Sequence, residues 1–196
     1  MANIHSIYSV AGSIVQFLRN AYPQALQEAH PCDFRVVSSS ELAEDTEDFN
    51  TAVTLYLYRT IINEHVRNSN LGRQSREVAP LSVDLHLMIS IWSESAAAEH
   101  TICAWVMRQL HQFPILDVSS LTEEGGWTAD DVVHIIPAEL SNEDLMRIWD
   151  AIAPYYRLSV SYIARVVRIE VDALGNEPPV IATQFAYDPG KDVTHG

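Results

Sequence analysis

The feature that most constrains the fold is the alternation of apolar and polar residues at 81–92, LSVDLHLMISIW. Every second residue from Leu81 to Ile91 is aliphatic, and the residues between them are mostly polar. A period of two puts one set of side chains on each side of a β-strand, so the pattern predicts a long strand with one buried side. Such a strand needs partner strands and a helical layer over its aliphatic side.

The first predicted partner is the stretch at 51–62, TAVTLYLYRTII. It is rich in β-branched and aromatic residues, with Val53, Leu55 and Leu57 on one side. The two stretches predict a long antiparallel hairpin. Its connection at 65–80 is polar and without periodicity, and it carries Arg67, Arg73 and Arg76. This segment predicts an exposed arm, either a contact or a mobile surface loop.

Helical spacing marks three further segments. Residues 4–20 have Tyr8, Ile14 and Leu18 on one predicted side and Ser6, Ser9 and Ser13 on the other. Residues 93–113 have a stripe of apolar residues at helical spacing around Trp105. A third helix is predicted after Ser141. Short strands are predicted at 33–38, 115–118 and 132–137. The acidic run at 41–50 predicts a solvated loop.

The last predicted strand covers 158–171 and changes character along its length. Up to Val166 its residues alternate, and beyond that point apolar residues occupy both sides, interrupted by Arg168 and Glu170. This change indicates a β-bulge, or a strand end that is buried by something outside its own sheet.

These elements predict an α/β (α+β) fold with a single β-sheet, a long extended hairpin and about three flanking helices. A chain of 196 residues is long enough for one such domain, which we place at 1–172, with a C-terminal tail at 173–196 rich in Gly and Pro. The two cysteines, Cys32 and Cys103, do not suggest a disulfide framework and favour a reducing compartment. Cys103 is expected in the core.

The charge balance points toward protein partners. The chain has 12 Lys and Arg against 26 Asp and Glu, a formal net charge of −14. This excess argues against nucleic acid or an anionic membrane as a partner. The first 20 residues lack a basic leader, and we expect neither a signal peptide nor a membrane anchor.

No motif predicts catalysis, a cofactor or a metal. Phosphate loops and nucleophile elbows are absent from the sequence, and the acidic pairs at 123–124 and 130–131 flank a Gly-rich turn typical of a solvated loop. Asp84 and His86 point the same way from one strand, but a polar strand face explains them better than a metal site. Trp92, Trp105 and Trp149 are expected in the core, whereas Trp127, in the turn, is a candidate exposed contact.

Three segments together resemble a known family. They are PLSVDLHLMISIWS, then MRQLHQFPIL at the end of a helix, then IPAELSNEDLMRIWDAIAPYYRLSVSYIARVVRIE, in this order. They resemble the cap, or tail-terminator, proteins of contractile injection systems, phage-tail-like particles such as the Photorhabdus virulence cassette and the antifeeding prophage. The resemblance runs from about Ile4 to Val171.

This resemblance implies a structural protein and not an enzyme. It implies a homohexameric ring on the upper end of the inner tube and sheath, which stops their growth; the protein would be cytoplasmic during assembly and part of a particle that is released or anchored in the cell. Candidate contacts with another subunit, the tube or the sheath are Arg67, Arg73, Arg76, Trp127, Arg168 and Glu170. The sequence leaves two alternatives open: a cap adaptor that links the particle to another cap protein or a membrane-attached partner, or an acidic binding module outside any particle.

Overall fold

A computed structural model describes residues 2–44, 50–63, 80–152 and 155–170. Its centre is a six-stranded sheet with the strand order β1-β2-β3-β6-β5-β4. The strands are β1 (Asp33–Val37), β2 (Ala52–Ile62), β3 (Leu81–Trp92), β4 (Ile115–Leu116), β5 (Val133–Pro137) and β6 (Ser159–Ile169). The helices are α1 (Ser6–Ala21), α2 (Gln24–Ala29), α3 (Ser39–Glu44), α5 (Ala96–Gln112) and α6 (Asn142–Ile152), with a 3-10 turn, η2, at Glu123–Gly125.

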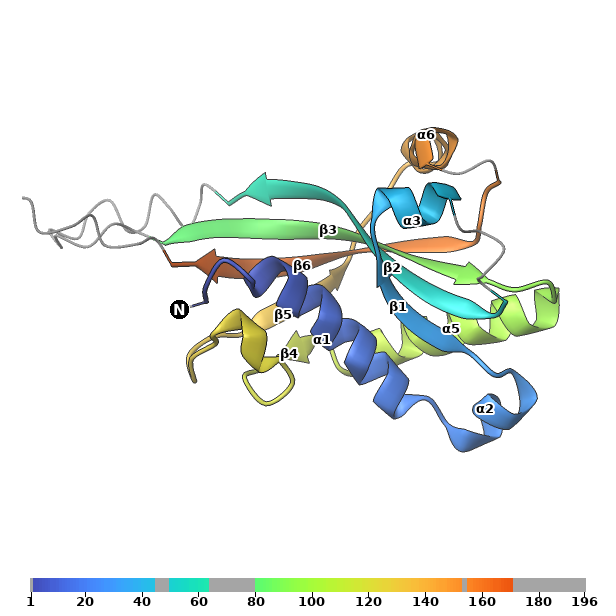
Figure 1. The fold of residues 1–196 in the computed structure, drawn as a ribbon, viewed down its shortest axis with the longest axis horizontal. Helices are drawn as coiled ribbons and strands as arrows, with labels where there is room; N and C mark the ends of the chain where they lie inside the picture. Colours follow the sequence, from blue (N-terminus) through green and yellow to red (C-terminus); the bar gives the residue numbers. More distant parts are fainter. Residues whose placement is uncertain (1, 45–49, 64–79, 153–154, 171–196) are drawn as a thin grey trace, which may run out of the picture.

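The predicted hairpin is present as a pair of long antiparallel strands. Residues of β2 and β3 pair from Ala52 opposite Trp92 to Ile62 opposite Val83. On its other side β3 pairs antiparallel with β6, and β1 lies parallel to the first half of β2. The alternation at 81–92 therefore belongs to an inner strand, which confirms the predicted fold class of helices around a single sheet (Figure 1).

A β-bulge interrupts β6 where its sequence pattern changes. Leu85 pairs with Ala164, whereas Val83, two residues away on β3, pairs with Val167, so β6 carries one extra residue between these pairs. The bulge resets the side to which each residue points, which lets both Ala164 and Val167 reach the same core. This confirms the bulge that the pattern at 158–171 predicted.

The main core lies on the side of the sheet that α1 and α5 cover. Leu85 and Leu87 from β3, with Ala164 from β6, are at most 1% exposed there. Helix α5 contributes Ile102 and Trp105 to the same cluster, and Cys103 is buried with them, as predicted. Cys103 and Cys32 are both free thiols.

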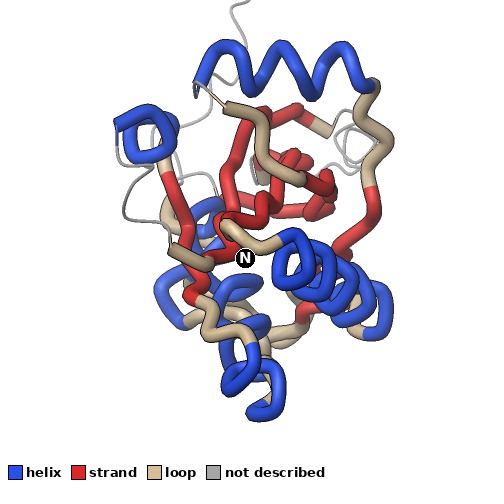
Figure 2. Tube along the Cα trace, turned by 90° about the vertical axis from the view of Figure 1, so that its right-hand side faces the viewer, coloured by secondary structure: helices blue, strands red, loops and turns tan. Residues whose placement is uncertain are grey.

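A smaller core lies on the opposite side of the sheet, under α3 and α6. It joins Met88 and Trp92 of β3 to Trp149 of α6 and Leu42 of α3, all at most 2% exposed. The indole N–H of Trp149 donates to Ser159 Oγ at 3.2 Å. Figure 2 shows helices on both sides of the strands, with α6 uppermost. The expected core positions of Trp92, Trp105 and Trp149 are thus confirmed.

Two local predictions were wrong. The acidic run at 41–50 begins as a helix, because α3 extends to Glu44 and packs Leu42 against the smaller core; residues 45–49 lie outside the described residues. The serines of α1 form a buried side, with Ser6, Ser9 and Ser13 at most 1% exposed, whereas Tyr8 is 63% exposed. Small hydroxyl side chains fit a close contact with a neighbouring loop, which the helical period alone does not reveal. The short helix α2 was not predicted.

Candidate contact surface at the end of the sheet

The N-terminus and the end of β6 meet at one end of the sheet, which we call the distal end. Ala2 forms a parallel β-bridge with Ile169, and the backbone N–H of Glu170 donates to Ala2 O at 2.7 Å. Leu81, the first residue of β3, pairs with Ile169 from the other side. The end of β6 is therefore buried in part by residues outside the strand order of the sheet, and Val167 is fully buried.

The loop around η2 is fixed to α1 by hydroxyl groups. Ser9 Oγ lies 2.7 Å from Thr122 Oγ1, and the backbone N–H of Thr122 donates to Ser13 Oγ at 2.8 Å. The indole N–H of Trp127 donates to Ser9 Oγ at 2.9 Å. These serines, which position Trp127, were missed in the sequence because they looked like the polar side of the helix; their spacing of four residues was the available clue.

Gly125 allows this loop to approach α1. A Cβ at Gly125 would overlap the indole ring of Trp127 and lie 2.8 Å from Ser9 Oγ. The next residue, Gly126, has a φ of +66° in the left-handed region, which suits glycine. Trp127 is consequently half-buried and packs against the main core, instead of standing free as an exposed aromatic.

Beside Trp127 lies a cavity of about 260 Å³ at the edge of β6. Its lining includes Arg168 of β6, His134 of β5, and the carboxylates of Asp130 and Asp131. Asp131 is buried and accepts hydrogen bonds from the Thr128 backbone N–H (2.8 Å) and hydroxyl (2.9 Å), so it closes the turn before β5. The cavity is open to solvent at the exposed residues Asp130, His134 and Arg168.

Three of the six predicted contact residues gather at this end of the molecule. Trp127 and Arg168 line the same cavity, and exposed Glu170 lies beside Ala2 in the bridge with the N-terminus. Arg67, Arg73 and Arg76 lie outside the described residues, as does the predicted tail at 173–196. A contact role for any of these six residues stays a prediction.

Asp84 and His86, on the polar side of β3, contact neighbouring side chains. Asp84 accepts hydrogen bonds from Asn63 Nδ2 at 3.1 and 3.2 Å and lies 3.3 Å from the guanidinium of Arg165. The His86 ring packs edge-on against Tyr58, with 5.9 Å between ring centroids. Among the described residues, no group of three or more His, Cys, Asp and Glu side chains could hold a metal ion. The hydrogen bonds of Asp84 agree with its interpretation as part of a polar strand face.

The surroundings of His86 favour its neutral form. Partial burial lowers the pKa of His86, and the nearby guanidinium of Arg59 lowers it further, against the opposing effect of Asp84. Burial also affects Cys32: together with the neighbouring Asp33, it raises the pKa of the Cys32 thiol to about 12. Cys32 therefore stays protonated and unreactive near neutral pH. Helices long and apolar enough to cross a membrane are absent from the described part of the chain.

Two solved structures share this fold. One is the sheath/tube terminator of an extracellular contractile injection system, PVC, in its extended state: 14% identity, a TM-score of 0.55, and coverage of 98% of this chain and 66% of the other. The second is the tube-terminating cap of the anti-feeding prophage, with 17% identity, a TM-score of 0.54, and coverage of 91% and 60%. The chain thus spans a little under two thirds of the length of these proteins. No curated protein matches the chain.

The sequence itself also matches a family model. The model describes the Pvc16 N-terminal domain, and it matches residues 9–183, which is most of the chain. This match confirms the resemblance to the cap family, and the two solved structures show that the fold of this chain is shared with a sheath/tube terminator and a tube-terminating cap. The chain belongs to the Pvc16 N-terminal domain family.

Proposed function

We propose that this protein is a cap of a contractile injection particle, which forms a ring on the upper end of the inner tube and sheath and ends their polymerisation. The observation that carries the proposal is the family match over residues 9–183, together with a fold shared with two tube terminators over nearly the whole chain. Within the proposal, the subunits are identical and the partners are tube and sheath proteins. Assembly takes place in the cytoplasm.

The surface of the described residues supports a role in protein assembly. Large apolar side chains stand exposed on separate elements: Ile4 (79%) before α1, Tyr8 (63%) on α1, and Tyr155 (69%) after α6. Such side chains are often buried when a subunit joins an assembly. Repeated in each copy of a ring, even weak contacts of this kind add up to stable binding at a tube end.

Electron microscopy of particles from cells that lack the gene tests the function. We expect tubes and sheaths that are overlong, open-ended or unstable, and normal lengths again when the gene is supplied in trans. Particles of normal length with normal ends would contradict the cap function. An adaptor would then remain if the protein still sediments with purified particles, and a binding module outside the particle if it does not.

The size of the ring needs its own measurement. Native mass spectrometry of the cap, released from purified particles, gives the number of copies directly. We expect six copies, which is the number that the family resemblance implies. A single copy per particle end would contradict a ring, whatever the effect of the gene deletion on tube length.

A further inference from the structure

The side of the sheet that carries α3 and α6 is only half covered. These two helices lie over one half of β2, β3 and β6, and among the described residues no helix lies over the other half (Figure 1). Met88 of β3 marks the border, since it is the last residue of this side that belongs to the smaller core. The uncovered half, beyond Met88, extends from β2 across the sheet to β4.

Strand pairing defines this uncovered half as two rows of side chains, which we call the open face. One row follows the pairs of β2, β3, β6 and β5 and consists of Arg59, His86, Ile163 and Ile136. The second row runs from β2 to β4 and consists of Ile61, Asp84, Arg165, His134 and Ile115. Directly paired residues point to the same side of a sheet, so all nine side chains share one surface.

Burial separates the open face from the other side of the same strands. Ile136 is 40% exposed and Ile115 is 51% exposed, whereas their neighbours on the strands, Ile135 and Leu116, are each 2% exposed. Aliphatic side chains on a strand contribute to stability when they are buried, at about 25 cal/mol per Å² of apolar surface. The isoleucines of the open face are therefore apolar surface, and a partner that buries them would stabilise the complex.

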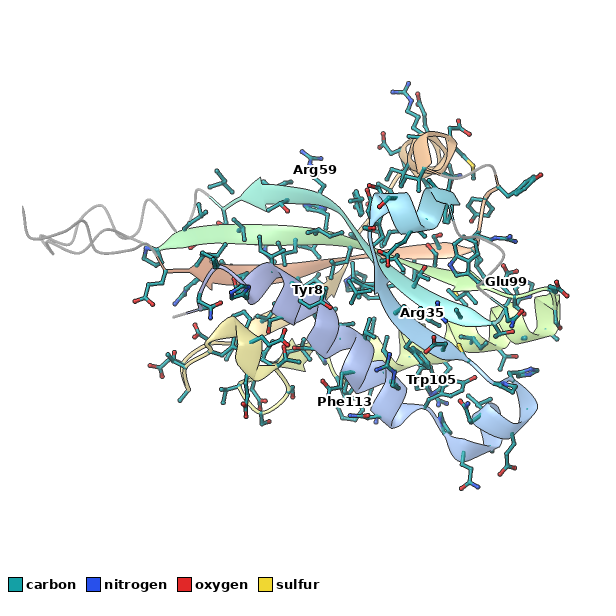
Figure 3. All side chains as sticks on the ribbon, in the orientation of Figure 1. Tyr8, Arg35, Arg59, Glu99, Trp105 and Phe113 are labelled. Carbon is teal, nitrogen blue, oxygen red and sulfur yellow. The ribbon has the colours of Figure 1, made fainter. Side chains whose placement is uncertain are left out.

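The charge of the open face is opposite to that of the whole chain. Its only carboxylate, Asp84, is already bonded to Asn63 and Arg165. Arg59 is exposed and points away from the sheet on this side (Figure 3). With histidines counted as neutral, Arg59 and Arg165 against Asp84 give the open face a formal charge of +1 (two positive minus one negative), while the chain as a whole has a formal net charge of −14. The open face is thus apolar and basic on an acidic protein.

These observations identify the kind of partner. We propose that the open face binds an acidic surface of a second copy of this chain and forms the contact between neighbouring subunits of the ring. Exposed carboxylates are plentiful on the described surface, for example Glu143 and Asp150 of α6 and Glu123 and Glu124 of η2. Complementary charge brings two surfaces together and fixes their orientation.

The same charges determine the symmetry of the contact. The open face has more arginines than carboxylates, so an acidic surface complements it better than a second open face does. A contact between the open face and an acidic surface joins two different surfaces, head to tail, and a head-to-tail contact closes into a ring when the rotation between copies allows it. This inference rests on the ring in the proposed function and names the surface that builds it.

Site-specific photo-crosslinking identifies the occupant directly. A photoreactive benzoyl-phenylalanine at Ile136, in particles assembled in cells, should give an adduct with twice the mass of the chain. The same probe at Met107, which is 46% exposed on the far side of the sheet on α5, is the matched control and should give no such adduct. An adduct of Ile136 with a tube or sheath protein, or no adduct at all, would overturn the proposal.

Charge reversal tests the basis of the contact. Arg59→Glu should lower the yield of the Ile136 adduct on the order of tenfold, because it places like charges opposite each other. Arg108→Glu makes the same change of charge at an exposed arginine of α5 and should leave the yield unchanged. Equal yields in both variants would show that charge on the open face does not hold the subunits together.

The two proposals can fail separately. If deletion of the gene lengthens the tubes but the Ile136 probe captures no second copy, the cap function stands and the open face is not the subunit contact. If the deletion leaves the tubes unchanged while the probe captures a second copy, the self-association stands and the cap function is wrong.

Discussion

One side of the sheet contains two halves that differ in what covers them. Near Trp92 and Met88, the helices α3 and α6 bury the strands from above, so both sides of the sheet are inside the protein. Beyond Met88, the same strands keep their buried aliphatic side, while on the other side Arg59 is exposed and His86 and Ile163 are half-buried. Burial on both sides of the sheet therefore stabilises the covered half, whereas the open half keeps a surface that can bind a partner.

The covered half should depend most on Trp149. Trp149 is 2% exposed and packs edge-on against Trp92, with 6.1 Å between ring centroids. Trp149→Ala should lower the free energy of unfolding by about 3–5 kcal/mol, the usual cost of truncating a buried aromatic residue. Urea denaturation followed by tryptophan fluorescence measures this loss.

A control on the same helix makes that result specific. Met146→Ala removes a side chain that is 43% exposed on the outer side of α6, and it should cost about 0.5 kcal/mol or less. Equal, small losses of unfolding free energy in the two variants would mean that α6 contributes little to the covered half. The contrast between the two halves would then be wrong.

In the open half, the largest stability effect should come from Asp84. Its carboxylate is 14% exposed and holds both Asn63 and Arg165. Asp84→Ala removes the acceptor of these bonds and should cost about 1–3 kcal/mol in urea denaturation. Asp150→Ala, at an exposed carboxylate of α6, is the matched control and should have almost no effect. An equal, small effect of both would show that the open half needs no internal polar bonds.

The sequence predicted the aliphatic side of the strands, but it did not predict which half of the other side is covered. The alternation from Leu81 to Ile91 placed β3 and its aliphatic side correctly, because a period of two depends only on the pleat of a strand. It could not show that Met88 on the other side is also covered, since that depends on where α6 packs in three dimensions. Arg59 and Ile136 were not selected as candidate contacts, because their exposure also depends on where α6 packs.

The distal end shows a similar limit. Trp127 and Arg168 were selected from unrelated patterns, a turn and a strand end, and the structure places them in one cavity because β5, which follows the turn, pairs with β6. The hydrogen bond from Trp127 to Ser9 depends on a loop that returns to α1, and no local spacing encodes that return. Local patterns thus found the elements and the bulge, whereas contacts between distant segments required the fold.

The smallest effect concerns the pH dependence of stability in the open half. The pKa of His86 is lowered below its usual 6.5 in the folded protein by partial burial and by Arg59. Unfolded chains therefore bind more protons at this residue as the pH falls through 6.5, so the free energy of unfolding should decrease on acidification. His86→Gln should reduce this decrease between pH 7.5 and pH 5.5, measured by urea denaturation, while His100→Gln on α5 controls for the loss of a histidine. A stabilising effect of acid at His86 would mean that Asp84 favours the protonated ring more than partial burial, Arg59 and Arg165 together disfavour it, and the open face would then be less basic than its arginines indicate.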